Sequence, residues 1–190
     1  MSEGIITHVE HPTGLIVGRF NPPHLGHSYM IEWAATRCDR LVVFVNTRDG
    51  ELVPGELRAE WLAVLHPGVT VVEVRHDLDT NFDDEELWAK WMALFRSQWP
   101  HESGPDAVFS SDPYVAGIAD RFGAVPVVVD ADRVAVPISA TMVREAPADW
   151  QDGDDVIIGS AVTNEEAEKL FPQGWTTIKP YLRTLAQPNK

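Results

Sequence analysis

The sequence predicts an α/β fold, a doubly wound, Rossmann-like parallel five-stranded sheet with helices on both faces. Short β-branched apolar runs recur along the chain and alternate with segments of helical periodicity. The runs are continuous rather than alternating, which is typical of strands covered on both faces. The five predicted strands are 14–18, 41–45, 69–74, 107–109 and 125–129. Because ligands bind beyond the carboxyl ends of such strands, the loops after each strand are where we expect the site.

Helical periodicity fills the intervals between the strands. The predicted helices are 27–37, 56–65, 84–99 and 114–122. Gly123 is expected to terminate the last of these, and Ser139 is a plausible N-cap for a further short helix. The acidic run 83–86 falls at a helix start, where the helix dipole favours negative side chains. Trp91 is expected in the core, at helical spacing from its apolar neighbours.

Length and composition predict one main domain over 14–145. It is preceded by an N-terminal extension, 1–13, and followed by a C-terminal extension, 146–190, packed on the same domain. Hydrophobic residues make up 44% and charged residues 23%, as in ordinary globular proteins. The single cysteine, Cys38, excludes a disulfide within the chain and is expected to pack as a small hydrophobe. With no signal-peptide pattern and no run of roughly 18 apolar residues, the sequence predicts a cytoplasmic protein with no membrane partner.

The net charge of −14 limits the classes of partner. Tight, non-specific binding to nucleic acid or anionic lipid needs clustered Lys and Arg, so we expect neither partner. A phosphate-bearing small molecule needs only a local group of donors and stays compatible with an acidic protein.

The loop after the first predicted strand reads Gly18-Arg19-Phe20-Asn21-Pro22-Pro23-His24-Leu25-Gly26-His27. A spacing of three brings the rings of His24 and His27 to one side if a helix has begun. Gly26 allows close approach of a phosphate, and a helix N-terminus offers free N–H groups. An isolated pair of this kind is more often two surface histidines. The preceding strand and the following helix favour a phosphate-binding loop in this chain.

A second polar segment follows the fifth predicted strand. It runs Val136-Pro137-Ile138-Ser139-Ala140-Thr141-Met142-Val143-Arg144. Thr141 and Arg144 are three apart and can share a helix face with the capping Ser139, so hydroxyls and a guanidinium could bind one anion. Taken alone, the segment is equally well interpreted as a capped surface helix.

The two segments together resemble the HxGH nucleotidyltransferases. Residues 18–27 resemble their GxFxPxHxGH loop and residues 138–144 their ISxTxxR motif. Within that superfamily the chain is most similar to nicotinamide-nucleotide (NMN) adenylyltransferases, nearest the adenylyltransferase half of bifunctional adenylyltransferase/ribosylnicotinamide kinases. Residues 57–62, 108–112 and 130–144 add to this resemblance. The kinase activity is expected to be absent because no G-x-x-x-x-G-K-[ST] loop occurs in the sequence.

The resemblance implies a reaction and a set of residues. ATP and NMN would give NAD and pyrophosphate, with Mg²⁺ bound mainly through the ATP phosphates and no protein metal ligand. The implied catalytic residues are His24, His27 and Arg144. The implied ATP- and phosphate-binding residues are Gly18, Arg19, Phe20, Asn21, Gly26, Ser111, Asp112, Arg133, Ser139 and Thr141. Asp77 and Trp88 would bind the acceptor, and relatives of this kind often form homo-oligomers.

Three alternatives stay open at this point. Another nucleotidyltransferase of the same fold would make a CDP-alcohol, a pantetheine nucleotide or FAD. A non-catalytic nucleotide-binding module would keep the fold without the reaction. For Trp88, stacking on a nicotinamide ring and packing in the core with Leu87 and Trp91 carry nearly equal weight, and Trp88→Ala would separate them.

Overall fold

The computed structural model describes residues 9–51 and 53–145, without the side chains of Val143 and Arg144. Its sheet is parallel throughout, in the order β3-β2-β1-β4-β5. The strands are β1 (His11–Gly18), β2 (Cys38–Thr47), β3 (Thr70–Arg75), β4 (Ala107–Ser110) and β5 (Val125–Val128). The helices are α1 (Leu25–Ala35), α2 (Gly55–Leu65), α3 (Glu85–Gln98), α4 (Val115–Phe122) and α5 (Ala140–Glu145).

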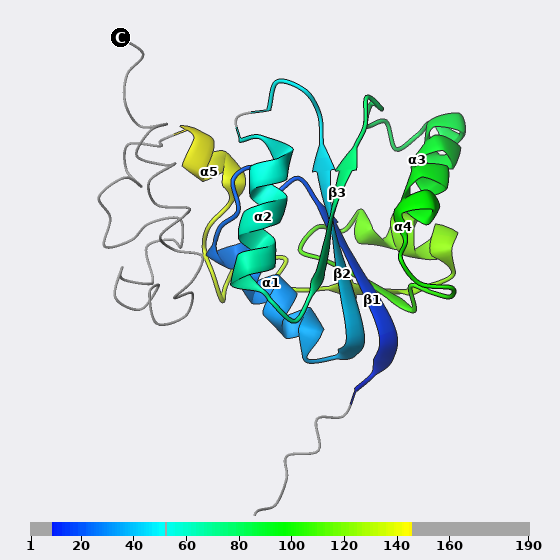
Figure 1. Cartoon of the computed structure of the whole chain (residues 1–190), viewed down its shortest axis with the longest axis horizontal. Coiled ribbons are helices and arrows are strands. Elements are labelled where there is room, and N and C mark those ends of the chain that lie inside the picture. Colours follow the sequence, from blue (N-terminus) through cyan, green and yellow to red (C-terminus); the bar gives the residue numbers. More distant parts are fainter. Residues whose placement is uncertain (1–8, 52, 146–190) are drawn as a thin grey trace, which may run out of the picture.

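Helices cover both faces of this sheet, with α1 and α2 on one face and α3 and α4 on the other (Figure 1). Each face has its own core, because successive side chains of a strand point to opposite faces. Leu15 and Phe44 pack toward α3 and α4, whereas Ile16 and Val43 pack toward α1 and α2. The doubly wound fold class predicted from the sequence is therefore confirmed, and the chain crosses over at β1, the middle of the sheet.

The bounds of the predicted strands differ from the structure by one to three residues, and β1 and β2 each begin three residues earlier than predicted. β1 begins at His11 rather than Gly14, inside the predicted N-terminal extension. The early start is fixed by Thr13, whose backbone N–H and hydroxyl donate to the Asp106 carboxylate at 2.9 and 2.6 Å. The prediction that every strand is covered on both faces is wrong for β5, since Val125 and Val128 are each about half exposed. β5 is one of the two edge strands of the described sheet and pairs with β4 alone among the described residues.

The predicted capping residues are confirmed, although α1 begins and ends two residues earlier than the predicted 27–37. Asp84 caps α3 by accepting hydrogen bonds from the N–H groups of Glu86 and Leu87, which explains the acidic run at this point. Gly123 ends α4 with a φ of +71°, a left-handed conformation that glycine adopts without strain. The Ser139 hydroxyl accepts from the N–H of Met142 at 3.2 Å and caps α5.

Cys38 is buried in the core, as expected, and desolvation raises the pKa of its thiol to about 12. No helix in the described part of the chain is both long and apolar enough to cross a membrane. The predicted C-terminal extension and residues 1–8 of the N-terminal one lie outside the described residues.

Candidate active site

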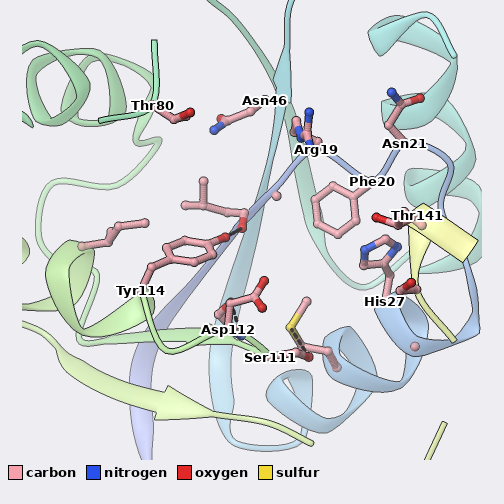
Figure 2. Close-up of a pocket in the computed structure, with 18 of the residues that line it drawn as sticks. Arg19, Phe20, Asn21, His27, Asn46, Thr80, Ser111, Asp112, Tyr114 and Thr141 are labelled. Carbon is pink, nitrogen blue, oxygen red and sulfur yellow. Dashed lines mark hydrogen bonds between the residues drawn. The ribbon is translucent and has the colours of Figure 1, made fainter. Parts of the chain in front are cut away.

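A pocket of about 520 Å³ lies at the carboxyl ends of the strands (Figure 2). Its walls come from the loop after β1, the ends of β2, β3 and β4, and the segment between β5 and α5. We call one side the histidine end, formed by His24, His27, Arg133, Ser139 and Thr141. We call the other the β3 end, formed by Asn46, Arg48, His76, Thr80 and Phe82. Figure 2 shows His27 and Thr141 on one side of the pocket and Asn46 and Thr80 on the other.

His24 and His27 hold each other at the start of α1. His24 is the N-cap, and the N–H of His27 donates to its Nδ1 at 3.3 Å. In return the N–H of His24 donates to Nδ1 of His27, also at 3.3 Å. The two rings stack with centroids 3.6 Å apart. The pair therefore forms a reciprocal capping box built from imidazoles instead of the usual hydroxyl and carboxylate.

This capping fixes where each neutral histidine carries its proton. An Nδ1 atom that accepts a hydrogen bond is unprotonated, so the proton of the neutral ring lies on Nε2. Burial, reinforced by the positive charge of Arg133, lowers the pKa of His27 to about 3. His27 is therefore neutral at physiological pH and can donate through Nε2–H.

Glycines make room for this arrangement. A Cβ at Gly26 would lie 3.0 Å from the His24 ring, and one at Gly18 would lie 3.0 Å from the ring of Phe20. Phe20 is 2% exposed and packs edge-on against His27 with centroids 4.7 Å apart. The sequence suggested that Gly26 leaves room for a phosphate, but in the structure the space above it belongs to the His24 ring.

Arg133 is held beside the histidines by Asp130. The Asp130 carboxylate accepts from the backbone N–H groups of Val134, Ala135 and Val136 at 2.8 to 3.2 Å. Although desolvation acts in the opposite direction, these three bonds lower the pKa of Asp130. Asp130 and Arg133 both have positive φ, 50° and 51°. The carboxylate thus fixes the tight loop that presents Arg133 to the pocket.

Beneath the loop after β1 lies a buried cation. Arg58 of α2 is fully buried and donates to the carbonyl oxygens of Arg19 and Asn46, and it pairs with the Glu51 carboxylate. Burial lowers its pKa, while Glu51 opposes the shift. Asn21 also fixes this loop, because its Oδ1 accepts from the N–H of Val53 at 3.0 Å. These contacts tie the ends of β1 and β2 together below the pocket.

The β3 end contains residues that the sequence reasoning missed. Asn46 and His76 stand at or just after strand ends, Phe82 lies in the loop before α3, and Tyr114 precedes α4. Phe82 is 56% exposed and its ring lies nearly parallel to that of Tyr114, with centroids 5.8 Å apart. The signal that could have found Asn46 and His76 was their position within two residues of the ends of predicted strands.

Trp88 has both of the features expected for it. It lines the pocket, yet it is 7% exposed and belongs to the core packed by α3 and α4. The Arg121 guanidinium lies 4.2 Å from its ring centroid, and its indole N–H donates to the Phe82 carbonyl at 3.0 Å. Trp91 is buried as predicted and donates to the Asp79 carbonyl at 2.9 Å. Packing therefore dominates at Trp88, and the exposed aromatic ring at this end is Phe82.

Most of the other predicted site residues meet in this one pocket. Those that line it are Gly18, Arg19, Phe20, Asn21, His24, Gly26, His27, Trp88, Ser111, Asp112, Arg133, Ser139 and Thr141. Asp77 is exposed and is not among the lining residues. The Arg144 side chain lies outside the described residues, although its backbone is in α5. Nowhere in 9–51 or 53–145 do three or more His, Cys, Asp or Glu gather to hold a metal ion.

A parallel sheet with a capped helix and a ligand-sized pocket at its strand ends is the architecture of nucleotide-binding α/β proteins. The chain belongs to the cytidylyltransferase-like family, whose model matches residues 15–146. The pocket described above lies within the residues that this family model matches.

Solved structures show the same fold. A bifunctional NMN adenylyltransferase/ADP ribose pyrophosphatase from Francisella tularensis superposes with a TM-score of 0.62 at 15% identity, over 93% of this chain and 52% of that one. NadR protein in complex with NAD and AMP-PNP superposes with a TM-score of 0.56 at 23% identity, over 73% of this chain and 43% of that one.

The curated relatives match this chain over short stretches. In the two relatives described next, the matched stretch spans less than a fifth of the relative's own length. A nicotinamide-nucleotide adenylyltransferase of Aeropyrum pernix is 52% identical over 33 residues, which is 17% of this chain and 19% of that protein. A 1-Cys peroxiredoxin of Dictyostelium discoideum is 61% identical over 44 residues, 23% of this chain and 18% of that protein. In this chain the thiol of Cys38 is buried and has a raised pKa, which disfavours the thiolate form.

Proposed function

We propose that this protein is a nucleotidyltransferase, specifically an NMN adenylyltransferase, which converts ATP and NMN to NAD and pyrophosphate. The observation that carries the proposal is the imidazole capping box at the entry of α1. It leaves a neutral Nε2–H donor on His27 in a pocket that His24, Arg19 and Arg133 also line. Hydrogen-bond donors and cations in one pocket suit the charge that develops on a phosphate under attack.

The proposed reaction needs no general base. An oxygen of the NMN phosphate attacks the α-phosphorus of Mg-ATP, a new P–O–P bond forms, and the bond to the β-phosphate breaks to release pyrophosphate. Because the nucleophile is already anionic, the protein's part is to position the substrates and stabilise charge. His27 donates to the transferred phosphate, with His24 beside it. Ser139, Thr141 and Arg144 hold the leaving phosphates.

The β3 end would then hold the acceptor. It is separated from the histidines across the pocket, and it carries the exposed ring of Phe82 next to Tyr114. A flat aromatic ring can stack on such side chains, which favours a nicotinamide over a pantetheine or a small alcohol. Relatives named for NMN adenylyl transfer support this choice of acceptor.

A substrate panel tests the proposal. The purified protein would be incubated with ATP or CTP, with Mg²⁺, and with NMN, FMN, phosphopantetheine or a phosphoalcohol, and the pyrophosphate and nucleotide products measured. The proposal predicts NAD from ATP and NMN at the highest kcat/KM. Formation of a CDP-alcohol, dephospho-coenzyme A or FAD without NAD would assign the chain to another nucleotidyltransferase. ATP binding without any turnover would indicate a binding module.

A further inference from the structure

Two polar atoms at the β3 end are buried without a partner. Oδ1 of Asn46 and Nδ1 of His76 make no hydrogen bond to any group in the described structure, although both residues line the pocket. A buried polar atom without a partner costs free energy, and such atoms in native proteins usually serve a ligand or hold strain. These two atoms therefore point to a polar group of the molecule that fills this end.

The fold places the two residues on one face of neighbouring strands. Asn46 of β2 pairs in register with Val74 of β3, and His76 follows Val74 by two residues. Side chains two apart on an extended chain project to the same face. The N–H of His76 donates to the Thr47 carbonyl at 3.0 Å, and its ring packs edge-on against Trp91 with centroids 4.4 Å apart. The imidazole is therefore held in place on the same face of the sheet as the Asn46 side chain.

The charges around this pair are mixed, with the cation of Arg48 set among several carboxylates. Burial first, and then the positive charge of Arg48, lower the pKa of His76 against the opposing effects of the Leu78 backbone and nearby carboxylates, so its ring is neutral at physiological pH. Arg48 in turn lies 3.5 Å from the carboxylate of Asp79. The adjoining loop and helix start carry further acidic side chains, Asp77, Asp83, Asp84, Glu85 and Glu86. A neutral polar group fits these surroundings better than a second carboxylate does.

We propose that Asn46 and His76 recognise the carboxamide of the acceptor's pyridine ring, an inference that rests on the proposed function. On this assignment the enzyme takes nicotinamide mononucleotide in preference to nicotinic acid mononucleotide.

The preference follows from hydrogen-bond chemistry. A carboxamide offers both N–H donors and a carbonyl acceptor, and so does the Asn46 amide, whose terminal torsion turns easily. A neutral imidazole nitrogen likewise serves as donor or acceptor according to tautomer. The ionised acid has acceptors only, so it leaves Oδ1 of Asn46 unpaired and adds a negative charge next to the acidic loop. An unpaired buried acceptor is expected to reduce kcat/KM for the acid on the order of 10- to 100-fold.

The test measures kcat/KM for the amide and the acid mononucleotides side by side, with saturating Mg-ATP and the full-length protein. The inference predicts a ratio of at least about 10 in favour of the amide. Equal use of both, or preference for the acid, would overturn the inference and leave the proposed function standing. Turnover of neither mononucleotide would overturn the proposed function and the inference with it.

Two variants at Asn46 have different effects on the amide-to-acid ratio of kcat/KM if the assignment is right. Asn46→Leu replaces the amide oxygen and nitrogen of Asn46 by methyl groups of similar volume. The acid then leaves no buried acceptor unpaired, so the amide-to-acid ratio of kcat/KM should fall toward about 1. Asn46→Asp keeps an acceptor for the amide N–H but repels the acid, so the ratio should stay high or rise. Arg75→Gln is the control, because Arg75 precedes His76 but has a side chain 64% exposed and does not line the pocket. A ratio that is the same in all three variants would contradict the role of Asn46.

Discussion

At the histidine end of the pocket, His24 and His27 satisfy each other through two hydrogen bonds, whereas at the β3 end Asn46 and His76 hold polar atoms without partners in the described structure. The histidine end is complete before any substrate arrives, since its capping box is part of α1. At the β3 end, the described residues offer no hydrogen-bond partner to Oδ1 of Asn46 or Nδ1 of His76. We conclude that the histidine end is preorganised for a constant group, and that the β3 end is where the ligand must supply the matching chemistry.

The two ends also differ in how their aromatic residues are used. At the histidine end Phe20 is buried and supports His27. At the β3 end Trp88 is buried and bonds to the backbone of Phe82, while the Phe82 ring stays exposed. At the β3 end, Trp88 therefore supports the fold and Phe82 is the ring available to a ligand, and substitutions can distinguish these two roles.

The largest expected effect is the loss of folding stability when the Trp88 side chain is removed. Trp88→Ala should lower the free energy of unfolding by about 3–5 kcal/mol, because it empties a packed site between α3 and α4. Chemical denaturation of both proteins measures this. A variant with unchanged stability and a raised KM for the acceptor alone would restore Trp88 as a stacking residue.

At the histidine end, His27→Ala should reduce kcat by roughly 10²–10³-fold, the loss typical of one charge-stabilising donor. Binding of NMN should change little, since His27 lies across the pocket from the β3 end. Single-turnover rates and NMN titration of the variant separate the two effects. Near-normal kcat with an intact fold would remove His27 from the chemistry.

Asp130 offers a smaller effect at the same end. Asp130→Ala releases three backbone N–H groups and with them the loop that presents Arg133. The KM for ATP should rise by about tenfold, equivalent to about 1.4 kcal/mol. Asp130→Asn keeps Oδ1 as the acceptor for Val134 and Ala135 and should recover part of the loss. Equal KM values in Asp130→Ala and the unmodified protein would show that Arg133 does not depend on this carboxylate.

The smallest effect is expected at Phe82. Phe82→Ala should raise the KM for NMN by roughly 2- to 10-fold, the size of one aromatic contact. Because the ring is 56% exposed, the melting temperature should stay nearly constant, in contrast to Trp88→Ala. Steady-state kinetics and thermal unfolding on the same preparations provide the check. A lowered melting temperature without a change in KM would make Phe82 a structural residue.

Sequence reasoning predicted the histidine end and the fold far better than the β3 end. His24 and His27 lie in one short loop whose strand, prolines and helix start can all be read locally, and the capped start of α5 is equally local. The positions of the strands and their two-sided covering follow from local apolar patterns, apart from β5, whose edge position no local signal reveals.

The β3 end depends on contacts between distant segments. Asn46 and His76 meet only because β2 and β3 are neighbours in register, and neither residue stands in a recognisable motif. The sequence favoured Asp77 over His76 because it does not show which of two adjacent side chains faces the pocket. The reason for Gly26 was likewise invisible, since the ring of His24 folds back over it only in three dimensions.

The central claim is that the histidine end transfers AMP to a mononucleotide bound at the β3 end. ATP labelled at its α-phosphate tests this most directly when it is incubated with NMN, Mg²⁺ and the protein, and the products are separated by chromatography. We predict that the label appears in NAD and that an equal amount of unlabelled pyrophosphate is released, and that both form roughly 10²–10³-fold more slowly in His27→Ala. Label that stays in ATP or AMP, with no dinucleotide formed, would contradict the account.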